Sequence, residues 1–182
     1  VKKGDEVITP PNSFIASTAT IIHLGAKPVF VDVKDDQNID ENKIEEKITK
    51  KTKAIMPVHL TGRMCAMDKI MKISKKYKIP VIEDCAQSIL SKYKNKMSGA
   101  WGDVGCFSFF SNKNLSIGEG GMVSTLDVEL NKKLGYLRSH GMTTLTLDRH
   151  KGRAITYDVA QPGLNYRMDE IRAAIGSVPL DK

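Results

Sequence analysis

The chain has 182 residues, a formal net charge of +7, 41% hydrophobic residues and 27% charged residues. This balance is typical of a folded globular protein and excludes a disordered or fibrous chain. The length suits one domain, or one large domain with a fragment of another. No apolar run approaches the ~20 residues that cross a bilayer, so we expect no membrane-spanning segment.

The charged residues and the cysteines indicate an ordinary cytoplasmic protein. Lysines recur at helical spacings, as at Lys69 and Lys72, which is typical of solvated helix faces and not of a nucleic-acid surface. An anionic substrate would still benefit from the positive field. The three cysteines, Cys65, Cys85 and Cys106, form no CxxC pair. We therefore predict buried, reduced thiols in a reducing compartment.

Short apolar runs alternate with helical patterns along the first half of the chain. Strands are predicted at 6–10, 28–33, 54–58 and 80–84, and helices at 12–24, 40–50 and 68–77. Asn12 or Ser13 is expected to cap the first helix, and Gly25 to end it. Near-continuous apolar strands that alternate with helices predict a parallel sheet covered by helices on both faces.

The pattern changes in the second half. A polar excursion at 92–98 has a turn at Asn95, and strands follow at 104–110 and 121–125. Only about ten residues separate these two strands, too few for a parallel crossover, so we expect the second to be antiparallel to the first. Asp127 should cap a helix that ends at Arg138, 141–163 is irregular, and a last helix begins near Met168.

These elements predict the α/β fold class, with three α/β/α layers, a mostly parallel sheet and one antiparallel strand.

Polar side chains gather where the predicted strands end. Asp84 ends one strand and Gln87 follows three residues later, while Ser108 lies in the next strand and Lys113 in the loop after it. In an open parallel sheet, ligands bind beyond the carboxyl ends of the strands. We therefore expect these side chains to open onto one crevice.

Taken singly, a strand-end aspartate is usually structural and a loop lysine is usually solvated. Together they meet the needs of a phosphorylated pyridine aldehyde. A carboxylate such as Asp84 holds the proton on a pyridine nitrogen, and the Lys113 amine forms a Schiff base with an aldehyde. The phosphate needs hydroxyl and backbone donors, which Ser108 and glycine-rich turns can provide. The glycine cluster at 118–121 is interpreted as a turn that lets the backbone approach the cofactor.

At this point the sequence resembles the DegT/StrS-type nucleotide-sugar aminotransferases, a branch of the fold-type-I pyridoxal-phosphate (PLP) enzymes. The most specific matches are PVIEDCAQS at 80–88 and GDVGCFSFFSNKNLSIGEGGMVST at 102–125. Further matching stretches lie at 4–17, 25–33, 53–62, 137–141 and 163–176. The likeness covers nearly the whole chain in the family's order.

The resemblance implies a role for each matching residue. Lys113 would be the Schiff-base lysine and the proton shuttle, and Asp84 would pair with the pyridine nitrogen. Gln87 would lie near the ring hydroxyl or the ring face, and Ser108 would bind the phosphate. Phe14 matches the aromatic residue that stacks on the ring; the alternative from its pattern alone is a core position.

Asn165 matches a residue that reaches the phosphate of the partner subunit, which implies a homodimer with shared active sites. Arg167 and His140 match family patterns without an assigned role, and His59 is interpreted as a structural residue at a strand end. No metal site is expected.

The resemblance also implies the organisation of the chain. Residues 1–182 would form the PLP-binding large domain of an aspartate-aminotransferase-like fold. The chain does not begin with methionine, and the family's first strand and helix and its C-terminal small domain would be missing. We therefore expect a piece of a longer protein, incomplete at both ends, with little or no activity alone.

The implied reaction moves an amino group, commonly from glutamate, to a keto-sugar nucleotide in amino-sugar biosynthesis. One alternative is a related sugar dehydratase that uses the aminated cofactor, but such members replace the lysine with histidine. The others are a non-catalytic or regulatory protein of the same fold, and a doubly wound module that binds some other anionic ligand.

Overall fold

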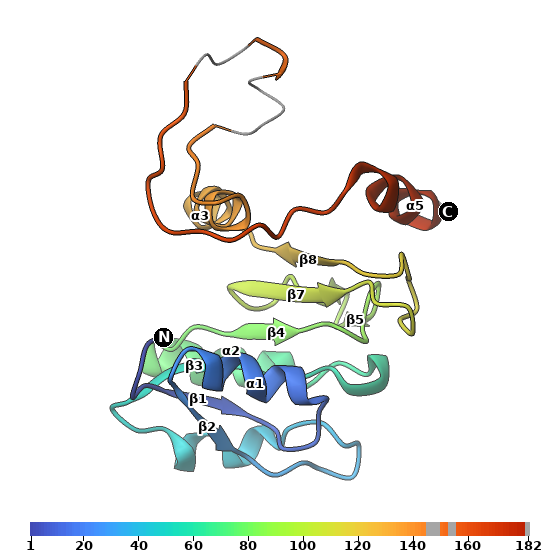
Figure 1. The fold of residues 1–182 in the computed structure, drawn as a ribbon. Helices are drawn as coiled ribbons and strands as arrows, with labels where there is room; N and C mark the ends of the chain where they lie inside the picture. Colours follow the sequence, from blue (N-terminus) through green and yellow to red (C-terminus); the bar gives the residue numbers. More distant parts are fainter. Residues whose placement is uncertain (145–149, 153–155, 181–182) are drawn as a thin grey trace. The chain divides into compact units, whose positions relative to one another are not determined.

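The computed structural model describes residues 1–144, 150–152 and 156–180 (Figure 1). The chain forms two compact units, Val1–Ser124 and Thr125–Lys182. Part of the irregular stretch predicted at 141–163 lies outside the described residues.

The first unit is built on parallel strands. Its sheet strands are β1 (Glu6–Thr9), β2 (Lys27–Phe30), β3 (Thr52–Ile55), β4 (Ile82–Asp84), β7 (Val104–Ser108) and β8 (Gly121–Ser124). One sheet has the order β2-β1-β3 and the other β4-β7-β8. Parallel bridges from Ile55 to Val81 and from Val58 to Asp84 continue the first sheet into the second. Among these six strands, only β8 runs antiparallel to its neighbour, which confirms the sequence prediction.

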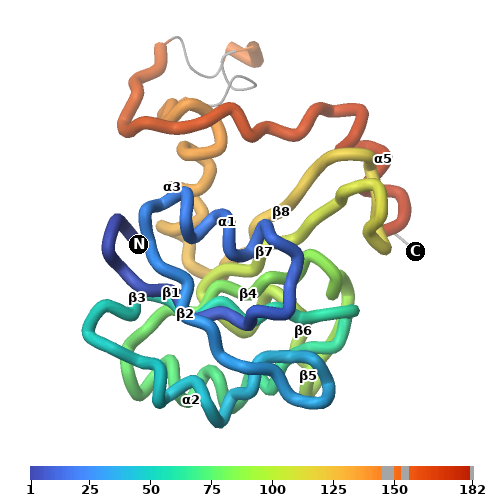
Figure 2. The backbone as a smooth tube through the Cα atoms, turned by 60° about the horizontal axis from the view of Figure 1, so that its bottom comes forward, coloured from blue at the N-terminus to red at the C-terminus, as the bar shows by residue number. Residues whose placement is uncertain are grey.

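Helices cover both faces of these strands, as Figure 2 shows for α1 (Ile15–His23) and α2 (Met67–Tyr77). Successive strand side chains point to opposite faces, so each face has its own core. Ile8 belongs to the cluster that contains Ile70 of α2. The preceding residue, Val7, packs in the cluster that contains Ile21 of α1. This confirms the predicted three-layer α/β arrangement with its mostly parallel sheet.

The helix predicted at 40–50 is wrong. The segment forms two short 3-10 turns, η1 (Glu41–Lys43) and η2 (Glu45–Lys47), and Ile48 is already extended. The Thr49 hydroxyl donates to Glu6 Oε2 at 2.6 Å, and the Thr49 N–H donates to the Thr52 hydroxyl at 2.9 Å. These hydrogen bonds hold the chain in an extended path that leads into β3, so the segment does not form a regular helix.

The predicted cap of the first helix is also wrong. Phe14, not Asn12 or Ser13, occupies the N-cap position of α1, and no side chain caps the helix. The Ser13 hydroxyl instead lies 2.8 Å from the Ser17 hydroxyl. A side-chain partner has therefore replaced the backbone N–H that a capping serine usually binds.

A hairpin accounts for the polar excursion at 92–98. It consists of β5 (Lys92–Tyr93) and β6 (Lys96–Met97), which pair antiparallel. Lys94 and Asn95 both have positive φ, 46° and 62°, as a two-residue hairpin turn requires. The chain after the hairpin then approaches β7 so closely that a Cβ on Gly105 would lie 2.3 Å from the Gly99 Cα.

The second unit contains α3 (Val128–Arg138) and α5 (Glu170–Leu180). The Asp127 carboxylate accepts the N–H of Leu130 at 2.9 Å, which confirms the predicted cap. Asp169 accepts the Arg172 N–H at 2.9 Å, so the last helix begins where the sequence predicted. Among the described residues, no helix has the length and apolar character needed to span a membrane.

Gly105→Ala should destabilise the protein by about 2 kcal/mol, because backbone atoms must move to admit the new methyl group. Gly135→Ala is the matched control, since nothing lies within 4 Å of a Cβ there and alanine favours the helix by roughly 0.5–1 kcal/mol. Urea unfolding followed by circular dichroism measures both changes. Equal stability of Gly105→Ala and wild type would contradict the close approach.

Candidate active site

Lys113 and Gln87 line the same cavity. Its volume is about 250 Å³, and Thr61, Asn112 and Asn114 complete its lining. Gln87 lies three residues beyond the end of β4, and Lys113 lies beyond the end of β7, which pairs with β4 in parallel. Both residues therefore come from the carboxyl edge of the sheet, where ligands bind in open α/β folds.

Buried apolar residues anchor the loop that carries Lys113. Leu115 and Ile117 pack with Phe109 in a small core cluster of their own. The Ile117 N–H donates to the Phe109 carbonyl at 3.0 Å, and the Lys113 N–H donates to the Phe110 carbonyl at 2.9 Å. The loop thus has a fixed base, and the Lys113 side chain, itself half-buried, faces the cavity.

Two donors orient the Asp84 carboxylate at the end of β4. Oδ1 accepts the Ala86 N–H at 3.1 Å, and Oδ2 accepts the Ser17 hydroxyl at 2.7 Å. Ser17 is buried in α1, 67 residues earlier in the chain. Each carboxylate oxygen keeps a lone pair for a further donor, so Asp84 can still bind a protonated nitrogen.

Phe14 immediately precedes α1 and its side chain is 71% exposed. The alternative of a core position is therefore wrong. The neighbouring Ser13 bonds to Ser17, which bonds to Asp84, so Phe14 lies beside the segment that orients this carboxylate. An exposed aromatic ring is a surface that a flat ligand can cover, and the Asp84 carboxylate that Ser17 holds is itself only partly buried.

The described residues that line the cavity do not include the remaining predicted site residues. Ser108 ends β7, and its hydroxyl accepts the Phe110 N–H at 3.3 Å. Asn165 belongs to the second unit, where it pairs with Ser139 in an antiparallel bridge. In the same unit Arg167 donates to the Ser139 hydroxyl at 3.1 Å, and His140 has a positive φ of 58°.

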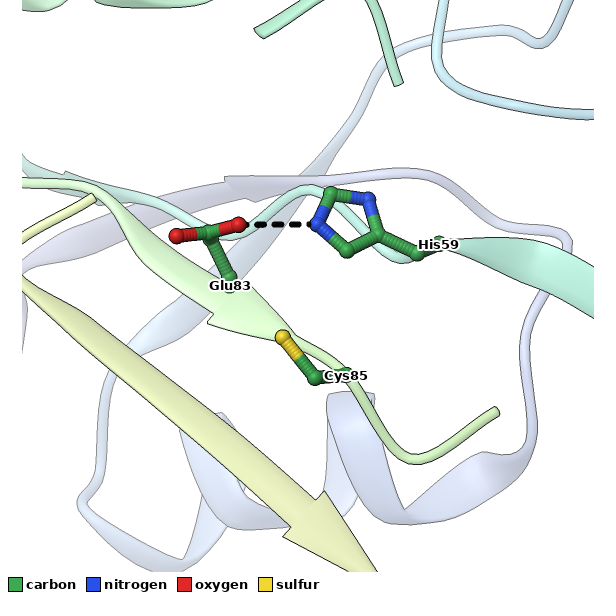
Figure 3. A group of neighbouring side chains, drawn as sticks. All are labelled: His59, Glu83 and Cys85. Carbon is green, nitrogen blue, oxygen red and sulfur yellow. Dashed lines mark hydrogen bonds and ion pairs between the residues drawn. The ribbon is translucent and has the colours of Figure 1, made fainter. Parts of the chain in front are cut away.

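A buried pair of side chains supports the strand end that carries Asp84. His59 and Glu83 are both 0% exposed, and His59 Nε2 lies 3.0 Å from Glu83 Oε2 (Figure 3). The Cys65 N–H donates to His59 Nδ1 at 3.2 Å, so this nitrogen carries no proton and Nε2 donates to Glu83. His59 therefore uses both ring nitrogens in buried hydrogen bonds, which supports its interpretation as a structural residue.

Glu83 also collects three backbone donors. Oε1 accepts the N–H groups of Trp101 at 2.8 Å and Gly102 at 2.7 Å, and Oε2 accepts that of Gly99 at 3.1 Å. Burial raises the pKa of Glu83, but the hydrogen bonds from His59 and the backbone outweigh it, so the pKa lies below its ordinary value. The carboxylate stays ionised and connects the backbone of Gly99–Gly102 to β4.

His59, Glu83 and Cys85 bring three potential metal ligands within 4.8 Å of one another (Figure 3). Both carboxylate oxygens and both imidazole nitrogens already have hydrogen-bond partners. Burial raises the pKa of the Cys85 thiol, which keeps it protonated. The hydrogen bonds of this cluster therefore connect neighbouring segments, and they occupy the nitrogen and oxygen atoms that a metal would need.

All three cysteines are free. Burial raises the pKa of Cys65 to about 12 and that of Cys106 to about 11. Cys65 and Cys85 are buried, as the sequence predicted, whereas Cys106 is only partly buried. The raised pKa keeps these thiols protonated and therefore weakly nucleophilic.

Sequence reasoning gave no role to several residues of this site, among them Asn112 and Asn114 in the cavity lining. Ser17 reaches Asp84, Thr61 lies in the cavity wall, and Glu83 anchors the strand. The charged Glu83 in the apolar strand run 80–84 was the one available signal, because an acid there must be paired. Ser17 and Thr61 carry no such signal.

The fold and the site define a class: an open, mostly parallel α/β domain with a lysine, a glutamine and an aspartate beyond its carboxyl edge. The chain belongs to the DegT/DnrJ/EryC1/StrS aminotransferase family, whose sequence model matches residues 1–182.

Two relatives in the family act on nucleotide sugars by name. The chain is 45% identical to a UDP-N-acetyl-3-dehydro-alpha-D-glucosamine 3-aminotransferase of Acidithiobacillus ferrooxidans, over 94% of the chain and 44% of that protein. It is 43% identical to the GDP-perosamine synthase of Caulobacter vibrioides, over 98% of the chain and 46% of that protein. The chain thus spans about half the length of the curated relatives that it matches.

Solved structures share the fold. PseC of Helicobacter pylori, an aminotransferase in the biosynthesis of pseudoaminic acid, is 34% identical with a TM-score of 0.91, over 100% of this chain and 47% of that one. The PLP-form of Spr1654 of Streptococcus pneumoniae is 33% identical with a TM-score of 0.88, over 100% of this chain and 50% of that one. These neighbours confirm the predicted fold-type-I architecture.

Glu83→Gln should destabilise the protein by about 2 kcal/mol at neutral pH, because an NH₂ group would face backbone donors in a buried site. The lowered pKa of Glu83 stabilises the folded state above the unfolded value of about 4.3, and this stabilisation is lost as the pH falls through the folded-state pKa. The stability gap between wild type and Glu83→Gln should therefore narrow below about pH 4.

Urea unfolding at neutral and acidic pH measures this gap, and Glu46→Gln on the exposed surface is the control. A gap that is equal at every pH would show that Glu83 does not carry a charge in the folded protein.

Proposed function

We propose that this chain forms the cofactor-binding part of a PLP-dependent aminotransferase that transfers an amino group from an amino acid, commonly glutamate, to a keto-sugar nucleotide. The observation that carries the proposal is the shared cavity of Lys113 and Gln87 at the carboxyl edge, next to the strand that ends in Asp84. The names of the two nucleotide-sugar relatives support the substrate class.

The residues fit the cofactor. Asp84 has an oriented carboxylate with spare lone pairs for a pyridinium N–H, and Phe14 offers an exposed ring to stack on it. Ser108 would bind the phosphate, together with backbone N–H groups. Structures of Spr1654 in PLP-form and PMP-form support this choice of cofactor.

PLP supplies an aldehyde that takes up the amino group and a ring that disperses negative charge. Lys113 would hold the cofactor through its Nζ atom, and the same amine would carry a proton to and from the reacting carbon. Asp84 would hold a proton on the ring nitrogen, because a carboxylate stabilises that cation through a charge-assisted hydrogen bond. The Ser17 hydroxyl keeps the carboxylate in its orientation.

The lysine favours amino transfer over sugar dehydration, since dehydratases of this kind carry histidine at the matching position. The proposed enzyme is a cytoplasmic homodimer in which Asn165 reaches the partner's phosphate, and residues 1–182 form its large domain. The three free thiols support a reducing compartment.

Incubation with PLP followed by borohydride reduction should leave the added mass on one peptide, the one that contains Lys113. Lys113→Ala should abolish the adduct, whereas Lys75→Ala, on an exposed part of α2, should leave it unchanged. Absorbance and peptide mass mapping measure the result, on this chain and on the full-length protein. No adduct on the full-length protein would overturn the proposal and favour a non-catalytic member of the fold.

Asp84→Asn should weaken PLP binding roughly tenfold or more, because a neutral amide does not stabilise the protonated ring nitrogen as a carboxylate does. Asp35→Asn removes a charge from an exposed turn and serves as the control. Equilibrium titration of PLP by absorbance measures the change. Equal affinity of Asp84→Asn and wild type would show that Asp84 does not contact the ring nitrogen.

A further inference from the structure

The turn at Leu60–Gly62, which contributes Thr61 to the lining of the cavity, has an unusual backbone. Thr61 has a φ of 54° and Gly62 a φ of 85°. A β-branched residue rarely adopts this left-handed conformation, because its side chain crowds the backbone. The conformation places the Thr61 N–H 2.7 Å from Gln87 Oε1. A strained turn therefore contacts a side chain that lines the same cavity as Lys113.

This contact determines how the Gln87 amide is turned. A backbone N–H can only donate, so the atom that it contacts must be the carbonyl oxygen of the side chain. The NH₂ group then lies at the free side of the amide, and in the described part of the chain it has no hydrogen-bond acceptor. Gln87 therefore uses its oxygen on Thr61 and leaves its two N–H donors for the cavity that it lines.

A buried asparagine holds the turn from its other side. Asn38 is 1% exposed, its Oδ1 accepts the Leu60 N–H at 3.1 Å, and its Nδ2 donates to the Arg63 carbonyl at 2.9 Å. The oxygen and the nitrogen of the Asn38 side chain therefore both bind the backbone of the turn Leu60–Arg63, which contains Thr61. Without them, the left-handed Thr61 could relax, and its N–H would move away from Gln87.

We propose that Asn38 and the turn at Leu60–Arg63 are positioning elements that fix the Gln87 amide with its NH₂ group toward the cavity. The cavity is thereby made selective for an oxygen anion beside Lys113. The identity of that anion as the ring oxygen of PLP rests on the proposed function. Asn38 and Thr61 act through Gln87 and are not themselves catalytic.

Amide hydrogen exchange of the cofactor-free protein tests the contact directly. Gln87→Glu keeps an oxygen for the Thr61 N–H, so the exchange rate of Thr61 should stay within about twofold of wild type. Gln87→Leu removes the acceptor, and Thr61 should exchange roughly tenfold faster. Asn38→Asp places an oxygen against the Arg63 carbonyl and should have the same effect as Gln87→Leu. An unchanged Thr61 rate in Gln87→Leu would overturn the proposal.

The PLP-loaded protein tests the direction of the donors. A hydrogen-bond donor at the ring oxygen stabilises the anionic form of that oxygen and lowers the pKa of the neighbouring imine nitrogen. The pH dependence of the imine absorbance measures this pKa. Gln87→Leu removes the donor and should raise the imine pKa. Gln87→Glu turns a carboxylate oxygen toward the anion, so it should raise the pKa further and bind PLP more weakly than Gln87→Leu does. Gln37→Glu, on the exposed surface, is the control for added charge.

The two tests separate the proposals. If wild type forms no adduct at Lys113, the proposed function fails, while the exchange rates still decide the orientation of Gln87. If wild type forms the adduct and Gln87→Glu has the same imine pKa as wild type, the positioning role is wrong. Circular dichroism shows whether Asn38→Asp folds. If it does not fold, the Thr61 exchange rates of Gln87→Leu and Gln87→Glu test the orientation of the Gln87 amide.

Discussion

The buried carboxylate of Glu83 is the interaction on which the site depends. It joins three segments: the chain at His59, the strand β4, and the backbone from Gly99 to Gly102. A buried charge is costly unless it is fully hydrogen-bonded, and four donors satisfy this one. Because Asp84 is the next residue along the strand, the constraint on Glu83 also fixes the position of the Asp84 backbone at the end of β4.

The surrounding side chains form layers of support around the cavity. Ser17 orients Asp84, and the turn at Thr61 orients Gln87. Each supporting contact joins segments that are far apart in the sequence, so the shape of the site follows from the folded sheet and not from any one loop. Such support is what keeps reacting groups in place when a charged ligand enters.

Family membership connects this arrangement to amino transfer. The motif EDxAQ and the lysine loop occur in one chain with the parallel sheet that brings them to one edge. The chain spans about half the length of these relatives. The amino donor, the sugar nucleotide and the partner subunit therefore belong to the proposal for the whole enzyme.

The sequence by itself determined the elements whose signals are local. Apolar periodicity predicted the parallel strands, the short connection predicted the antiparallel β8, and Asp127 predicted its own helix cap, because each depends on neighbouring residues. Tertiary structure alone decided the rest: the 3-10 turns at 41–47, the exposure of Phe14, and the left-handed Thr61. The 3-10 turns and the left-handed Thr61 go with hydrogen bonds to distant segments, and the exposure of a side chain depends on what the rest of the fold covers, so no local pattern in the chain encodes them.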